Sequence, residues 1–223
     1  MDQELTSTRA RLTTPRAAAV AGILFSVLLI ISLVLVRISV PADPQDAGAW
    51  LADSWKNVRL ALNLLPFSGV AFLWFIGVVR DRLGSHEDRL FATVFLGSGL
   101  LFLAMIFASA ATAGGVIAAF QTMPQQIIDT GLYGYGRATT YELMNTYAIK
   151  MAGVFMISTC TLFLRLKLAP RWIVYLGYAL ALCLLLSIGF ISWISLVFPL
   201  WTLLISVYIL IENYHRKAVP VAS

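Results

Sequence analysis

Six long apolar runs, separated by short charged connectors, constrain the fold of this chain more than any other feature. The runs cover residues 17–36, 60–79, 90–113, 143–164, 172–191 and 195–211, and Lys150 is the single Lys, Arg, Asp or Glu inside them. A helix that crosses a bilayer needs about 20 mostly apolar residues, and a helix satisfies its own backbone polar groups where water is absent. The sequence therefore predicts an all-α polytopic membrane protein with six transmembrane helices over residues 17–211, flanked by tails at 1–16 and 212–223.

Composition supports the same class. Hydrophobic residues make up 60% of the chain and charged residues 12%, whereas a soluble domain has about 25% charged residues. The net charge of +5 does not require a nucleic-acid partner, because excess Lys and Arg on cytoplasmic loops gives the same sum in a membrane protein. We expect the lipid bilayer as the main partner and no nucleic acid.

The basic residues predict the orientation of the helices. If the amino terminus is cytoplasmic, eleven basic residues fall on the inner side and four on the outer side. The inner set is Arg9, Arg11, Arg16, Arg80, Arg82, Arg89, Arg165, Lys167, Arg171, Arg216 and Lys217, and the outer set is Arg37, Lys56, Arg59 and Arg137. Because cytoplasmic loops are enriched in Lys and Arg, we expect both termini in the cytoplasm.

Several local features predict departures from a plain bundle. Pro66 lies inside the second run and removes a backbone donor, so we expect a kink there. The third run stays uncharged as far as Phe120, which predicts a break near Gly114 and Gly115. Two outer connections are long enough to hold structure: an interfacial helix with Trp50, Leu51 and Trp55, and a turn-rich loop at 121–140.

The sequence offers little support for catalysis in the membrane. Both histidines, His86 and His215, fall in predicted cytoplasmic segments, so neither can act as a haem ligand or as a catalytic base at membrane depth. All eleven acidic residues can be placed in connectors or tails, which argues against a carboxylate proton relay. We therefore expect a non-enzymatic protein with no catalytic residue, no metal site and no cofactor.

Lys150 has two interpretations. Counted back from Arg165, it lies about five residues inside the outer edge of the fourth run, where a lysine side chain can reach the surface. Alternatively, Thr146, Lys150, Gly153 and Thr161 share a polar face at 100° per residue. That face predicts an outward-facing polar cavity, which would bind a lipid headgroup or a small anionic amphiphile. Its candidate residues are Lys150, Asn63, Thr146 and Tyr147.

The stretch "FSGVAFLWFIGVVRDRLGSHEDRLFATVFLGSGLLFLAM", residues 67–105, contains a charged turn between two apolar runs. It resembles a family of uncharacterised bacterial multi-pass membrane proteins, and the resemblance implies the same architecture in a bacterial inner membrane, with no activity attached. The turn is a candidate docking surface for a cytoplasmic partner, with Arg80, Asp81, Arg82, Glu87, Asp88 and Arg89 as its residues.

Two functions follow from these patterns. The favoured expectation is an accessory or assembly subunit of a membrane complex, which needs only packing faces, the charged turn and a membrane-protein partner or a second copy of the chain. The alternative is a small carrier or a lipid-binding membrane protein, which needs the polar cavity around Lys150.

Overall fold

The computed structural model describes residues 2–41, 48, 50–81, 89–166, 169–187 and 193–218. For residues 2–15, 81, 89–91, 166 and 214–218 it describes the backbone alone. The side chains of the predicted tails therefore lie largely outside the described structure.

Within those residues the chain is helical and contains no strand. The elements are α1 (Asp2–Ser39), α2 (Trp50–Asp53), α3 (Trp55–Asp81), α4 (Arg89–Thr122), α5 (Pro124–Asp129), α6 (Leu132–Glu142), the π-helical turn η2 (Leu143–Ala148), α7 (Ile149–Leu166), α8 (Arg171–Leu186), the 3₁₀ turn η3 (Ile194–Leu196) and α9 (Val197–Ala218). Five helical segments are long and apolar enough to cross a membrane: Arg16–Ser39, Trp55–Arg80, Ala92–Thr122, Leu132–Arg165 and Ile194–Asn213. The all-α prediction is confirmed.

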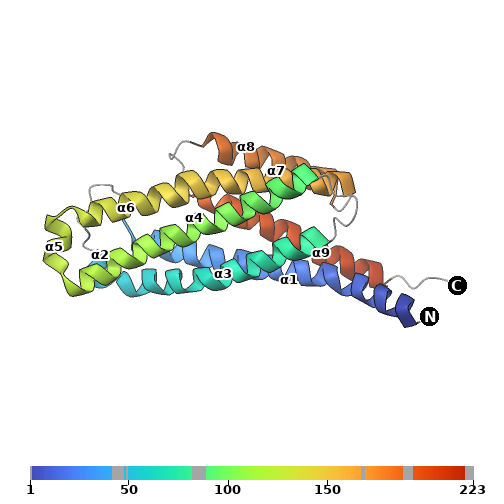
Figure 1. Cartoon of the computed structure of the whole chain (residues 1–223), viewed down its shortest axis with the longest axis horizontal. Helices are drawn as coiled ribbons and strands as arrows, with labels where there is room; N and C mark the ends of the chain where they lie inside the picture. Colours follow the sequence, from blue (N-terminus) through green and yellow to red (C-terminus); the bar gives the residue numbers. More distant parts are fainter. Residues whose placement is uncertain are drawn as a thin grey trace.

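The long helices lie side by side along one axis (Figure 1). The start of α1 and the end of α9 lie at one end of the bundle, here called the terminal end, whereas α2 and α5 lie at the opposite end, here called the α5 end (Figure 1). Because α7 finishes at the terminal end and α9 runs back toward it, the chain must return between them. The short helix α8 lies in this return.

Two predictions about where the chain is not helical are wrong. Helix α4 continues through Gly114 and Gly115 without interruption, because a glycine costs a helix only about 1 kcal/mol and breaking the helix in an apolar environment leaves unpaired backbone groups. The segment 121–140 is mostly helical, in α5 and α6, rather than a turn-rich loop. Only Gly131 there takes a left-handed backbone, with φ of 72°.

The fifth predicted run is shorter than expected as a helix. Helix α8 has 16 residues, which at 1.5 Å per residue is about 24 Å. It runs antiparallel to α7, with Gly153 against Ala181 and Leu185 and Gly177 against Cys160. Lys150, one turn beyond Gly153, is therefore level with the last turn of α8, and toward the α5 end α8 no longer accompanies α7.

Helix α9 is also absent from part of the bundle. Gly22 of α1 packs against Ser206 of α9, so in this antiparallel pair the first turn of α9 lies opposite residues near Ile31. Helix α1 extends eight residues further, to Ser39. The terminal half of the bundle thus contains α1, α3, α4, α7, α8 and α9, whereas four helices, α1, α3, α4 and α6, surround the α5 half.

The terminal half is filled by phenylalanine rings. Phe72 is fully buried, and its ring centroid lies 4.5 Å from that of Phe25, 5.2 Å from Phe155 and 5.5 Å from Phe102. Phe198 completes the group at 4.8 Å from Phe102. These edge-to-face and tilted pairs are the arrangements that aromatic rings favour, and they join α1, α3, α4, α7 and α9 into one core.

Candidate functional site

The α5 half contains a partly open cavity with a volume of about 260 Å³. Its walls are α1 from Ser32 to Pro41, α3 from Val58 to Leu65, α4 from Ile106 to Val116, and α6 with the π-helical turn from Tyr133 to Asn145. Trp50, Trp193 and Ser195 close the remaining sides. An engineered apolar cavity of 150 Å³ binds benzene, so this space is large enough for a small organic group.

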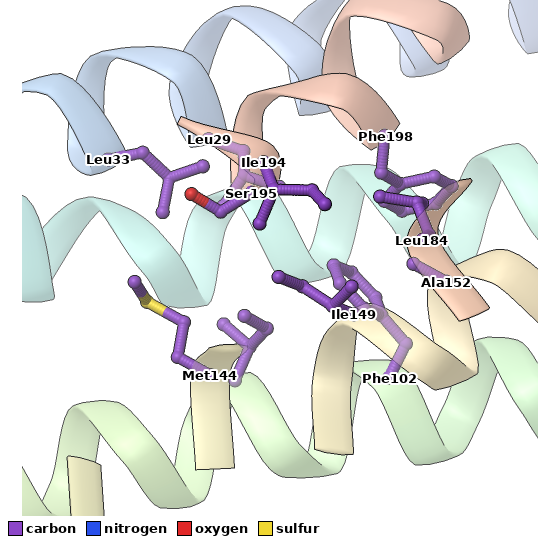
Figure 2. A pocket seen from close by; sticks show the side chains of 11 residues that line it. Leu29, Leu33, Phe102, Met144, Ile149, Ala152, Leu184, Ile194, Ser195 and Phe198 are labelled. Carbon is purple, nitrogen blue, oxygen red and sulfur yellow. The ribbon is translucent and has the colours of Figure 1, made fainter. Parts of the chain in front are cut away.

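The floor of the cavity, nearest the terminal half, is apolar. Leu33, Leu65, Ile106 and Met144 line it. A second void of about 10 Å³ adjoins the floor and shares Leu33, Ile106, Met144 and Ser195 with it. Figure 2 shows this void, in which the Ser195 hydroxyl is the single polar group among the labelled side chains. A space of this size and polarity is at the lower limit for one water.

Two arginines lie at the outer part of the same cavity. Arg137 on α6 donates from Nη2 to the carbonyl oxygen of Pro41 at 2.8 Å, while its Nη1 is buried and has no hydrogen-bond partner among the described residues. The guanidinium carbon of Arg37, on α1, lies 5.8 Å from the centre of the Trp193 ring. No carboxylate is among the described residues that line the cavity.

Arg137 and Arg37 are both half-buried in the cavity wall. A charged group taken fully out of water costs several kcal/mol unless an opposite charge and hydrogen bonds compensate, and a half-buried guanidinium bears part of that cost. Arg137 and Arg37 also bring two like charges to one cavity, which disfavours the empty state. A bound anion would offset both the desolvation and the like-charge repulsion, because a guanidinium forms strong, charge-assisted hydrogen bonds to carboxylate and phosphate oxygens.

Most other polar groups around the cavity already have partners in the protein. Ser109 donates to the Thr140 carbonyl at 2.9 Å, and Thr140 donates to the Gly136 carbonyl at 2.8 Å. The Trp50 indole donates to the Tyr133 hydroxyl at 2.9 Å. Asn145 donates through its amide nitrogen to the Tyr141 carbonyl at 3.2 Å, so its side-chain oxygen can still accept a hydrogen bond. The groups left for a ligand are therefore mainly the two guanidiniums.

The π-helical turn η2 contributes to the cavity wall. Met144 and Asn145 both belong to it and both line the cavity. The wider winding of the π-helical turn changes the direction in which the side chains on either side of it point. Before the turn, α6 faces the cavity through Tyr133, Arg137 and Thr140. After the turn, α7 packs on α8. Single π turns inside α-helices occur frequently at functional sites, and here the turn lies between the cavity and the packed core.

The predicted cavity residues lie elsewhere. Lys150 and Thr146 are half-buried, Tyr147 is 58% exposed, and none of the three lines a described cavity. Asn63 is exposed and lines a separate groove between α3 and α4.

The polar face that suggested the Lys150 cavity serves helix packing. Gly153 lies against Ala181 and Leu185 of α8, and the hydroxyls of Thr161 and Tyr178 are 2.8 Å apart. The π-helical turn also interrupts the 100° spacing on which the predicted face depended. A functional role for Lys150 stays a prediction.

The predicted docking surface is only partly described. Arg80 is exposed near the end of α3. The backbones of Asp81 and Arg89 end α3 and begin α4, whereas Arg82, Glu87 and Asp88 lie outside the described residues. A docking role for these residues stays a prediction.

The sequence did not identify Arg37 and Arg137 as site residues. Both appeared only as outer-side charges, although Arg137 lies in a segment rich in glycine and tyrosine and Arg37 directly follows an apolar run. An arginine among aromatic residues at the end of a span is a usable signal. That the two share one cavity depends on the fold.

Comparisons of the chain with protein-family models, with curated proteins and with solved structures found no match. The fold and the cavity therefore define only a class: a helical protein with membrane-length apolar helices and an arginine-lined internal cavity.

Proposed function

We propose that this protein is a non-enzymatic integral membrane protein that binds a small anionic amphiphile in the cavity of its α5 half. The observation that carries the proposal is Arg137, whose buried Nη1 has no hydrogen-bond partner within the described chain, beside Arg37 and above an apolar floor. Such a site has one end suited to a phosphate or carboxylate and the other suited to hydrocarbon.

The proposed orientation in the membrane agrees with this ligand. The chain crosses six times, with both termini cytoplasmic and the α5 end outside, in a bacterial inner membrane. The positive-inside bias supports this direction. Measured from Arg16, about 20 residues of α1 span the hydrocarbon, which places Leu33 inside it and Arg37 at its outer edge. A lipid of the outer leaflet has its headgroup and chain at these same depths.

The alternative role as an accessory subunit stays a separate prediction. It depends on the charged turn at 80–89, and loss of a stoichiometric partner on charge reversal there would test it. The cavity favours ligand binding, because an assembly subunit has no need of two guanidiniums at one internal space.

The experiment is a binding measurement on the full chain in mild detergent by native mass spectrometry. Dodecyl phosphate is the probe, and dodecyl phosphocholine, which has the same chain and no net charge, is the reference. We expect one dodecyl phosphate per chain and a preference for it over the reference. A hydrogen bond to a charged group contributes about 1.5–3 kcal/mol, so Arg137→Gln should weaken binding roughly 10- to 100-fold.

Lys56→Gln is the matched control. Lys56 also lies at the α5 end and loses the same charge, but it does not line the cavity, so its binding should stay within about twofold of wild type. Equal binding of both probes, or equal effects of the two substitutions, would contradict the proposal. The double variant Asp43→Asn/Asp46→Asn addresses two acids outside the described residues. Binding that requires these substitutions would show that the chain's own carboxylates fill the site, and would also overturn the proposal.

A further inference from the structure

A groove runs along the outer surface of the α3–α4 seam, on the opposite side of the seam from the cavity. Its volume is about 400 Å³. Helix α3 contributes Arg59, Leu62, Asn63, Leu65 and Pro66, and α4 contributes Phe107, Ala110, Ala111, Gly114, Ile117 and Ala118. From Phe107 to Ala118 the groove extends along α4 for about 16 Å at 1.5 Å per residue.

Only a thin wall separates this groove from the arginine-lined cavity. Leu62, Leu65 and Ala110 line both spaces. The cavity occupies α4 from Ile106 to Val116 and the groove occupies α4 from Phe107 to Ala118, so the two spaces lie at the same depth on either side of the same helices. Two leucine side chains and one methyl group form the shared boundary.

The wall is also locally weak. Pro66 has no N–H, so the carbonyl of Leu62, four residues earlier, lacks its usual helical donor. Across the seam, α4 offers the small residues Ala110 and Gly114, and a methyl group added at Gly114 would meet Leu62 only at 3.8 Å. Side chains at this point of the seam therefore have room to move apart.

The groove has the polarity of a lipid site. Asn63 is exposed on an apolar span, where an amide side chain is costly in contact with hydrocarbon. Arg59, one turn toward the α5 end, is exposed as well. The opposite end is formed by Pro66 and Phe107. A lipid of the outer leaflet would place its glycerol and headgroup region near Arg59 and Asn63 and an acyl chain along the alanines.

We infer that the α3–α4 seam is a lateral portal through which an anionic outer-leaflet lipid occupies the cavity directly from the bilayer. This inference rests on the proposed function. The cavity, at about 260 Å³, holds the headgroup side and the start of one chain, while the rest of the chain crosses the wall at Leu62, Leu65 and Ala110 into the groove. The ligand thus straddles the wall and need not pass through water.

The test uses the full chain in vesicles and the fluorescence of its own tryptophans. Trp50 and Trp193 line the cavity, whereas Trp74 and Trp172 are 68% and 60% exposed on the outside of the bundle. Vesicles contain phosphatidylglycerol brominated in its acyl chains or, as the reference, equally brominated phosphatidylcholine. Trp193 is 49% exposed beside Arg37, and Trp55 lies beside Lys56 and Arg59, so both are replaced by Phe in every protein compared. Extra quenching by the anionic lipid then reports occupancy of the cavity through Trp50.

We expect extra quenching in the wild type and its loss in Ala110→Phe, which fills the wall. Ala104→Phe is the matched control, since Ala104 is exposed on the same helix and lines neither space, and it should keep the extra quenching. A thermal unfolding midpoint close to that of the wild type, followed with a thiol-reactive dye on buried Cys160, should show that Ala110→Phe is folded. Leu62→Phe, which adds no tryptophan, is a second closing variant if Ala110→Phe does not fold.

The two ideas fail in different ways. Extra quenching that persists in both closing variants would overturn the portal and leave the proposed function intact, because the lipid would then reach the cavity from the Arg37 side. A wild type without extra quenching, and without dodecyl phosphate binding, would overturn both.

Discussion

The two halves of the bundle differ in how they are held together. In the terminal half six helices meet around stacked and edge-to-face phenylalanines, and Phe72 alone contacts the rings of Phe25, Phe102 and Phe155. In the α5 half four helices surround a cavity, and hydrogen bonds connect the elements: Trp50 to Tyr133, Arg137 to Pro41, and Ser109 to Thr140. The helices that leave the bundle early create the room for the cavity.

The difference shows how a small membrane protein can combine rigidity and an internal site. Helix association in lipid depends on close packing and on interhelical hydrogen bonds, because burying apolar surface gains little there. The terminal half uses close packing, and the α5 half relies more on hydrogen bonds between its elements. The site can therefore remain partly empty without loss of the fold.

The largest expected effect breaks the core of the terminal half. Phe72→Ala removes a ring from five aromatic pairs and should destabilise the protein by about 3 kcal/mol. Met144→Ala, at the edge of an existing cavity, should cost about 1 kcal/mol or less, since that side chain already lacks contacts on one side. Thermal unfolding can be followed with a thiol-reactive dye on buried Cys160, in a Cys183→Ser background that removes the exposed thiol. Equal shifts for both variants would remove the distinction between the halves.

A medium effect is expected at the glycines. A methyl group at Gly177 in the terminal half would meet the Cys160 sulfur and, at 2.6 Å, the Trp201 indole nitrogen. Gly177→Ala should therefore destabilise by about 2 kcal/mol. Gly115 on α4 has no atom within 4 Å of an added methyl group, so Gly115→Ala should be neutral or stabilising by up to about 1 kcal/mol. Urea unfolding monitored by tryptophan fluorescence gives both values, and a destabilised Gly115→Ala would show tight packing at the α5 half as well.

The smallest effect tests the hydrogen bonds of the α5 half. Ser109 donates across to the Thr140 carbonyl of α6, and hydrogen bonds between membrane helices contribute about 0.6 kcal/mol on average. Ser109→Ala should cost about that amount. Thr112→Ala loses a bond within its own helix, to the Ala108 carbonyl, and should change stability very little. Amide hydrogen exchange of residues 132–142 reports the stability of the contact between α4 and α6. Its rate should rise in Ser109→Ala and stay unchanged in Thr112→Ala.

The helical fold could be predicted from the sequence because the bilayer requires long apolar helices and leaves a clear hydropathy signal. Where the helices end was harder to predict. Gly114 and Gly115 resembled a break, yet the surrounding α4 keeps its backbone bonded through them. The apolar run 172–191 gave no sign that α8 would end at Leu186, because apolar residues after the helix look the same in a hydropathy profile.

The position of the arginine-lined cavity could not be predicted from the sequence. Helical periodicity pointed to Lys150 as the cation of a polar cavity, and two other residues of that face, Gly153 and Thr161, contact α8. The cations that line the cavity, Arg37 and Arg137, are separated by a hundred residues. Periodicity along one helix carries no information about such a pair, which depends on where α1 and α6 come together.

The π-helical turn at Leu143–Ala148 has a consequence for how this chain tolerates change. It offsets the rotational phase of α6 from that of α7, so the two segments of one continuous helix obey different constraints. Each residue added or removed in a helix turns everything beyond it by about 100°. Loss of one residue at this turn would realign Tyr133 and Arg137 relative to the α7 core and point them away from the cavity. The length of this short segment is therefore as tightly specified as its chemistry.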